Sequence, residues 1–177
     1  MRTETIARNY AEALFELAAR SGQAEHYADL IDAVAAAVET IPKVKAVLMS
    51  PRIPKAEKSR FLGAALKDTP RDFVLWLQAL VKRRRQGILR EIAVEYLGLV
   101  DQQLNRVRAS VTLARKPDEK LKRMIEDNLS RQLEKQVIAA YLVDPEILGG
   151  TIIRVADRVL DGSVRRRMTR LRRQLLK

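Results

Sequence analysis

The apolar residues of this chain change their spacing near residue 105, and this change limits the folds open to it. Before that point apolar side chains recur every three or four residues, as on the buried face of an amphipathic helix. From Arg106 to Leu113 apolar and polar residues alternate instead, which predicts a half-buried strand. We therefore expect a helical domain over residues 1–105 and a second domain of different class over residues 106–177.

Six short helices are predicted in the first domain. Pro42, Pro54 and Pro70 stand where new helices begin, and Thr69 is the expected N-cap of the fifth helix. The expected helices cover, in order, residues 6–18, 24–40, 42–49, 54–66, 70–81 and 88–105. Six amphipathic helices of this length predict a compact six-helix bundle.

The second domain is predicted to be a small α+β unit with the order βαββα. A helix with N-terminal Asp118 follows the strand of residues 106–113. Residues 136–143 (QVIAAYLV) are continuously apolar, which predicts a strand inside a sheet. A strand over residues 151–155 then leads through a tight turn at Ala156-Asp157 to residues 158–160. Asp161 and Ser163 are expected to cap the last helix.

The first helix is apolar around more than half of its circumference. One stripe at helical spacing contains Ile6, Tyr10, Leu14 and Leu17, and a second contains Ala7, Ala11, Phe15 and Ala18. The fifth helix is similarly broad. Periodicity alone leaves two alternatives open: the first helix is enclosed by its neighbours, or part of its apolar surface awaits another chain.

Residue composition argues against a catalytic role. The chain has no Cys and one His, which excludes thiolate nucleophiles, Cys-containing zinc sites and His-rich metal sites. No Gly-x-Ser-x-Gly or Walker pattern occurs, and Gly149-Gly150 precedes a strand rather than a helix. We expect no catalytic residues, no metal and no cofactor. The N-terminus lacks a signal peptide and no run could span a membrane, so we expect a soluble, intracellular chain.

The net charge of +12 is concentrated in the C-terminal part of the chain. Residues 1–105 contain 16 basic and 13 acidic side chains, whereas residues 106–177 contain 18 basic and 9 acidic ones. Arginines surround an apolar stripe on the last helix, as they would in an RNA-binding helix. Few aromatic residues are available for base stacking, and the same arginines would suit acidic side chains on a partner helix. A solvated face is the plain alternative.

Two segments at opposite ends of the chain resemble one known family. Residues 6–15 (IARNYAEALF) look like the opening of the delta subunit of F-type ATP synthases, the oligomycin-sensitivity-conferring protein family. Residues 149–175 (GGTIIRVADRVLDGSVRRRMTRLRRQL) are similar to that family's most specific segment. This sequence has Ala156-Asp157 where the family usually has Gly-Asp. The resemblance covers essentially the full length.

The resemblance implies a non-catalytic subunit of the peripheral stalk, or stator, on the cytoplasmic face of an energy-coupling membrane. In the family the first domain binds an N-terminal helix of an alpha subunit in a groove between its first and fifth helices. Transferred to this sequence, that groove would be lined by Ile6, Tyr10, Ala13, Leu14, Val74, Leu77, Gln78 and Val81. The second domain would hold the b subunits, and the contacts expected on its last helix are Val164, Arg166, Met168, Arg170 and Leu171.

The implied partners are therefore the alpha subunit and the b subunits, with no direct nucleic acid contact and membrane association only through the complex. An RNA- or ribosome-binding adaptor is the alternative from another functional class, favoured only by the charge. It predicts strongly salt-dependent binding at the last helix. An enzyme is the third alternative, and nothing in the sequence supports it.

Overall fold

A computed structural model describes residues 2–155 and 158–175. Over these residues the chain is mostly helical, with one small four-stranded sheet, and it divides into two compact units, residues 1–100 and 101–177. This division lies five residues before the expected boundary at 105/106. The helix that ends at Gln103 has its last turn in the second unit, because Asp101 in that turn binds Arg106 and Arg108 of the first strand.

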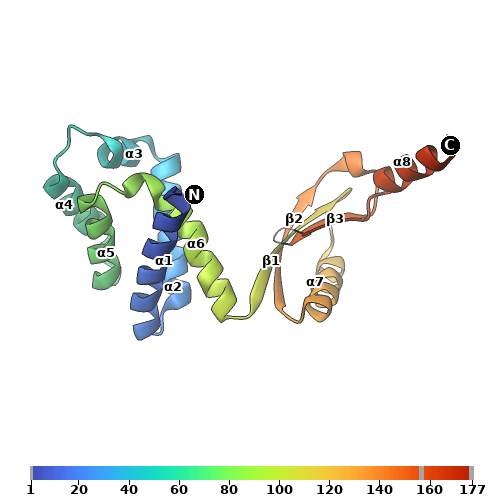
Figure 1. Cartoon of the computed structure of the whole chain (residues 1–177), viewed down its shortest axis with the longest axis horizontal. Helices are drawn as coiled ribbons and strands as arrows, with labels where there is room; N and C mark the ends of the chain where they lie inside the picture. Colours follow the sequence, from blue (N-terminus) through green and yellow to red (C-terminus); the bar gives the residue numbers. More distant parts are fainter. Residues whose placement is uncertain (1, 156–157, 176–177) are drawn as a thin grey trace. The chain divides into compact units, whose positions relative to one another are not determined.

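The first unit is helical. Its apolar core is built from all six α-helices, and a short 3-10 helix precedes the last of them. The helices are α1 (Arg2–Arg20), α2 (Ala24–Thr40), α3 (Pro42–Met49), α4 (Lys55–Ala65), α5 (Arg71–Lys82) and α6 (Leu89–Gln103), with η1 at Gln86–Ile88 (Figure 1).

Aromatic side chains fix how α5 and α6 pack in this unit. Phe73 of α5 lies edge-on to Tyr27 of α2, with ring centroids 5.6 Å apart. Tyr96 of α6 is fully buried, and its hydroxyl donates to the backbone oxygen of Ala24. Burial raises the pKa of this hydroxyl well above its usual range.

The two ends of α5 differ from each other in how they are capped. The expected N-cap, Thr69, does not cap the helix, because its hydroxyl donates to the backbone oxygen of Leu66 at the end of α4. At the other end Arg84 N donates to Val81 O and Arg85 N to Leu80 O, both at 3.0 Å. This is a Schellman motif, and it places Arg84 in the left-handed region with φ 56°.

The second unit contains a sheet and two α-helices. Its elements are β1 (Arg106–Leu113), α7 (Glu119–Leu133), β2 (Gln136–Val143), η2 (Pro145–Ile147), β3 (Thr151–Val155), β4 (Arg158–Asp161) and α8 (Val164–Leu175). Three of the four strands were placed correctly, but the expected order βαββα omitted one strand, because β4 pairs with β3 as a strand in its own right. The turn expected at Ala156-Asp157 lies outside the described residues.

The strand order is β2-β1-β3-β4, with β1 parallel to β2 and the remaining pairs antiparallel. The apolar strand β2 is therefore an edge strand, and its expected place inside the sheet was wrong. Helix α7 connects β1 to its parallel neighbour and packs on one face of the sheet (Figure 1). Val111, Leu129 and Val137 are buried there.

Among the described residues, the opposite sheet face is covered only at its ends, where Arg106 and Arg108 bind Asp101 of the preceding helix and Ile152 shares a cavity with α8. In register across it lie Thr112 of β1, Leu142 of β2 and Ile152 of β3. Leu142 and Ile138 of β2 are exposed, as is Val159 of β4. One face of the sheet thus forms the core and the other keeps apolar side chains at the surface.

The start of the second unit is held by a buried cluster of charges. Asp101 accepts hydrogen bonds from Nε of Arg106 and Nε of Arg108, each at 2.6 Å. The Asp101 and Arg106 side chains are both largely buried. Because one carboxylate holds two arginines, the end of α6 is fixed to β1.

No described helix, across residues 2–155 and 158–175, combines the length and the apolar character needed to cross a membrane.

Candidate functional site

The first candidate surface follows the contact between α1 and α5. Tyr10 of α1 lies edge-on to Trp76 of α5, with ring centroids 6.3 Å apart and an interplanar angle of 79°. Trp76 is mostly buried and stacks on Phe73. Its indole nitrogen has no hydrogen-bond partner among the described residues. The rings of Tyr10 and Trp76 form the apolar centre of the α1–α5 contact.

The α1 residues expected at this surface differ in exposure. Leu14 is fully buried in the core of the unit. Ile6 and Tyr10 are half-buried and Ala13 is exposed. These three occur at helical spacing on the flank of α1 that carries Tyr10 toward α5. The structure thus brings Ile6, Tyr10 and Ala13 together at the surface and turns Leu14 inward.

The α5 residues expected in the groove lie on other sides of that helix. Leu77 and Val81 are 1% and 2% exposed and belong to the core. Gln78 donates from Nε2 to the backbone oxygen of Ser59, at 2.9 Å, so it contacts α4. Val74 is half-buried, one helical turn before Gln78 on the same side. The expectation that Leu77, Gln78 and Val81 line a surface shared with α1 was therefore wrong.

The rotation of α5 about its own axis explains this difference. Gln78 is two residues, about 200° of helical rotation, from Trp76, so the two side chains point in nearly opposite directions. The flank that meets α1 carries Trp76, with exposed Asp72 and Ala79 at i−4 and i+3. Trp76 was not among the residues expected in the groove; its large apolar side chain on a flank of α5 is the signal that could have identified it.

The second candidate surface is helix α8. Its apolar residues Val164, Met168 and Leu171 are all exposed, and Met168 and Leu171 keep 57% of their surface. Helix α8 continues from the end of the sheet rather than lying across it (Figure 1). An amphipathic helix with an uncovered apolar stripe is typical of a docking element.

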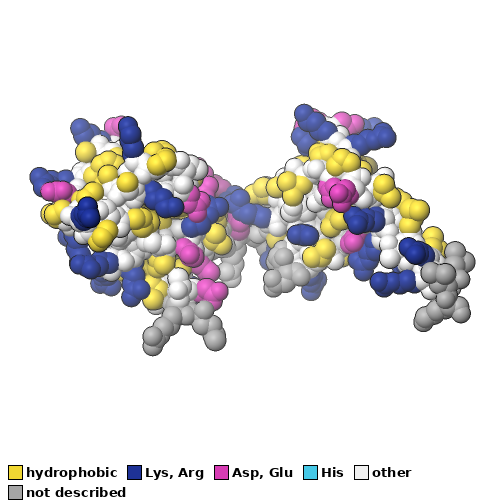
Figure 2. All heavy atoms as spheres, turned by 90° about the horizontal axis from the view of Figure 1, so that it is seen from above, with side chains coloured by type: hydrophobic (Ala, Val, Ile, Leu, Met, Phe, Trp, Pro, Cys, Tyr) yellow, Lys and Arg dark blue, Asp and Glu magenta, His cyan; other side chains and the backbone are white. Residues whose placement is uncertain are grey.

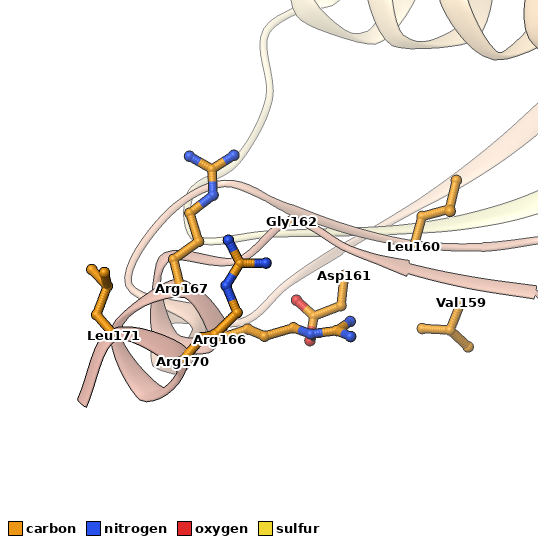
Figure 3. Close-up of a pocket in the computed structure, with 8 residues that line it drawn as sticks. All are labelled: Val159, Leu160, Asp161, Gly162, Arg166, Arg167, Arg170 and Leu171. Atoms are coloured by element: carbon orange, nitrogen blue, oxygen red, sulfur yellow. Dashed lines mark ion pairs between the residues drawn. The ribbon is translucent and has the colours of Figure 1, made fainter. Parts of the chain in front are cut away.

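The two arginines expected beside that stripe lie on the other side of α8. Arg166 and Arg170 line an open cavity of about 870 Å³ between β4 and α8 (Figure 3). They also line a second cavity of about 640 Å³ with Asp144 and Ile152. Val164 and Met168 thus lie on an apolar face of the helix and Arg166 and Arg170 on a cationic one, while Leu171 of the apolar stripe also lines the first cavity.

Asp161 lies between β4 and the arginines of α8. Its carboxylate accepts a hydrogen bond from Ser163 N at 3.0 Å and is 3.9 Å from Nη1 of Arg166. Hydrogen bonds from Ser163, with a smaller contribution from Arg166, lower the pKa of this carboxyl. Ser163 Oγ in turn accepts from Arg166 N, so the expected capping of α8 is confirmed for Ser163, whereas Asp161 bonds the N-cap residue rather than a helical N–H.

Basic side chains are exposed on both units, and acidic ones are fewer on the face seen in Figure 2. No group of three or more His, Asp or Glu side chains that could hold a metal ion occurs within residues 2–155 and 158–175. The α1–α5 contact and helix α8 thus present apolar and cationic surface to a partner.

The chain matches the family model for the ATP synthase delta (OSCP) subunit over residues 6–175. It is 43% identical over 173 residues to the ATP synthase subunit delta of Gemmatimonas aurantiaca, which covers 97% of this chain and 94% of that protein. The corresponding subunit of Desulfotalea psychrophila is 34% identical over 177 residues, covering 99% and 98%. The fold is similar to a chain of the Toxoplasma gondii mitochondrial ATP synthase hexamer, with a TM-score of 0.72, 20% identity and 97% coverage of both chains.

Proposed function

The chain belongs to the ATP synthase delta (OSCP) subunit family, and we propose that its two units connect the catalytic head of the enzyme to the membrane-anchored b subunits. Members of this family are structural subunits of the peripheral stalk and are not themselves catalytic. The observation that carries the proposal is that each unit has an uncovered apolar docking surface, at the α1–α5 contact and along α8.

The first unit, as a six-helix bundle, would bind the N-terminal helix of an alpha subunit beside α1. Ile6, Tyr10 and Ala13 supply one side of the surface, and Trp76 with Ala79 supplies the other. Small and aromatic side chains together leave room for the apolar face of an incoming helix. The half-buried state of Tyr10 means that much of its ring still has area to lose on binding.

The second unit would hold the ends of the b helices at α8. The stripe of Val164, Met168 and Leu171 would be buried by an apolar stripe of the partner. Arg166 and Arg170, on the other face, would meet acidic side chains of a b segment lying along β4. Because α8 is apolar on one side and cationic on the other, it favours a partner that contacts both sides.

The mechanism is mechanical. Rotation of the central stalk exerts torque on the head, which must be held still relative to the membrane sector during ATP synthesis. Burying about 500 Å² of apolar area at ~25 cal/mol per Å² amounts to ~12 kcal/mol before the costs of association. Two sites on one chain add avidity, since binding at one raises the effective concentration at the other. Its membrane association, on the cytoplasmic face, would come through the complex alone.

Isothermal titration calorimetry of the full chain with a synthetic peptide of the cognate alpha-subunit N-terminus tests the first site. Ala13→Arg should weaken binding at least about tenfold, because a long charged side chain would occupy the docking surface. Ala19→Arg, also exposed on α1 but on another side, is the matched control. Equal affinities for Ala13→Arg and Ala19→Arg would place the alpha helix elsewhere.

A further inference from the structure

A small cavity in the first unit is lined by cations and is separate from both docking surfaces. It has a volume of about 280 Å³ and lies where the α3–α4 loop, the start of α4 and the end of α5 meet. Lys55, Lys58 and Arg84 contribute to its lining, together with apolar side chains such as Ile53 and Val81, and no Asp or Glu does. Three positive charges on one small cavity produce a local positive potential.

Lys58 is the buried member of this group. It is 5% exposed, and Nζ donates to the backbone oxygen of Leu48 at 2.6 Å. Among the described residues no carboxylate forms an ion pair with Lys58, although an ammonium group has three donors. Lys55 likewise donates to a backbone oxygen, that of Lys82, at 2.7 Å. Burying an ammonium beside neutral acceptors alone is costly, and a bound anion would offset that cost.

Arg84 is placed at the cavity by an unfavourable backbone conformation. It occupies the left-handed C′ position of the Schellman motif after α5, with φ 56°. Glycine is the residue that this position favours, because any Cβ is strained there. The described hydrogen bonds of the motif are all made by backbone atoms, so the motif itself does not require an arginine. What the arginine adds is a basic side chain at a residue that lines the cavity.

From these observations we infer that the cavity is a binding site for a phosphate group. A phosphate presents several acceptor oxygens and up to two negative charges, which match a buried ammonium, a second ammonium and a guanidinium. The volume is at the low end for ligand sites, which favours a small group. The group is either free inorganic phosphate or the phosphate of a larger molecule such as a lipid. This site goes beyond the proposed role in the stalk and does not depend on it.

The test uses the full chain and inorganic phosphate at constant ionic strength. Binding is measured by calorimetry and by the rise of the melting temperature, since a ligand specific for the folded state stabilises it. Arg84→Gly should weaken phosphate binding about tenfold while raising the melting temperature of the free chain. Loss of binding in a more stable protein cannot be caused by misfolding. Arg83→Gln removes a charge from the adjacent residue, which does not line the cavity, and should change the affinity less than about twofold.

A second arm measures sedimentation of the chain with phosphatidylcholine vesicles that contain phosphatidic acid. Phosphate binding that Arg84→Gly weakens and Arg83→Gln does not would support a free-phosphate site. The same selective effect on vesicles alone would support a lipid phosphate at this cavity. Equal losses for the two variants in both arms, or no binding by the native chain in either, would overturn the site and leave only general charge attraction. Lys55→Gln, at an exposed lining residue, provides an independent variant that should also weaken phosphate binding, without the rise in melting temperature expected for Arg84→Gly.

Discussion

Four exposed residues in the described part of this chain accept a backbone conformation that glycine adopts more easily. Arg84, Asn105, Glu134 and Leu148 have φ values of 56°, 48°, 53° and 63°. Each follows a helical segment, a position at which the left-handed conformation commonly ends a helix. At Arg84 the proposed phosphate site accounts for the side chain. Glu134, which caps α7, has no comparable cavity in the described part of the chain.

Glu134→Gly should therefore stabilise the protein by about 1 kcal/mol, because glycine does not have the Cβ that strains this position. Urea unfolding of the full chain measures the change. Glu134→Ala is the matched control, since alanine removes the carboxylate but keeps the Cβ, and it should bring no comparable gain. A gain of the same size from alanine would show that the charge, rather than the backbone, is unfavourable.

At the scale of elements, the two units are joined within one helix, and the carboxylate of Asp101 fixes the end of that helix to β1. Asp101→Ala removes a largely buried carboxylate that binds two arginines, so it should lower the free energy of unfolding by about 3 kcal/mol. Asp32→Ala removes an exposed carboxylate that pairs with Arg90 at 2.8 Å and should cost less than about 1 kcal/mol. Similar losses for both variants in urea unfolding would contradict the structural role assigned to Asp101.

The apolar stripe of α8 gives a second prediction at this scale. Met168→Glu should weaken binding of a soluble b-subunit fragment about tenfold, because a carboxylate would be desolvated against an apolar partner. It should leave the melting temperature nearly unchanged, since Met168 is exposed in the free chain. Gln174→Glu makes the same charge change on an exposed α8 residue that lines neither cavity and should have a smaller effect. A pull-down in which both variants bind like the native chain would exclude the stripe as the contact.

The sequence predicts these elements more reliably than it predicts their orientation. The spacing of apolar residues and the prolines place the helices of the first unit close to where the structure has them, because both signals act within one element. The side of α5 that meets α1 depends on which neighbours surround that helix, so Trp76 was not recognised as the contact. Strand β2 was predicted from its composition to lie inside the sheet, but strand order depends on pairings between distant segments, which local pattern does not encode.

At the scale of the whole molecule, the two proposed docking surfaces differ in character and so should differ in their response to salt. The α1–α5 surface is mainly apolar, whereas α8 combines an apolar stripe with arginines. Between 50 mM and 500 mM NaCl we expect the affinity for the alpha-subunit peptide to change by less than about threefold. The affinity for a soluble b-subunit fragment should fall about tenfold or more. Calorimetry on the full chain measures both, and the opposite order would reverse the characters assigned to the two surfaces.

The position of β2 at the sheet edge affects how the newly made chain behaves before it joins the complex. Its outer backbone groups are unpaired by any described strand, and the same strand exposes Ile138 and Leu142 beside them. An open, apolar edge is a template for further strands, and proteins usually protect such edges with charges or prolines, which β2 lacks. Surplus copies of this chain would therefore tend to aggregate, so its synthesis has to keep pace with that of the subunits it joins.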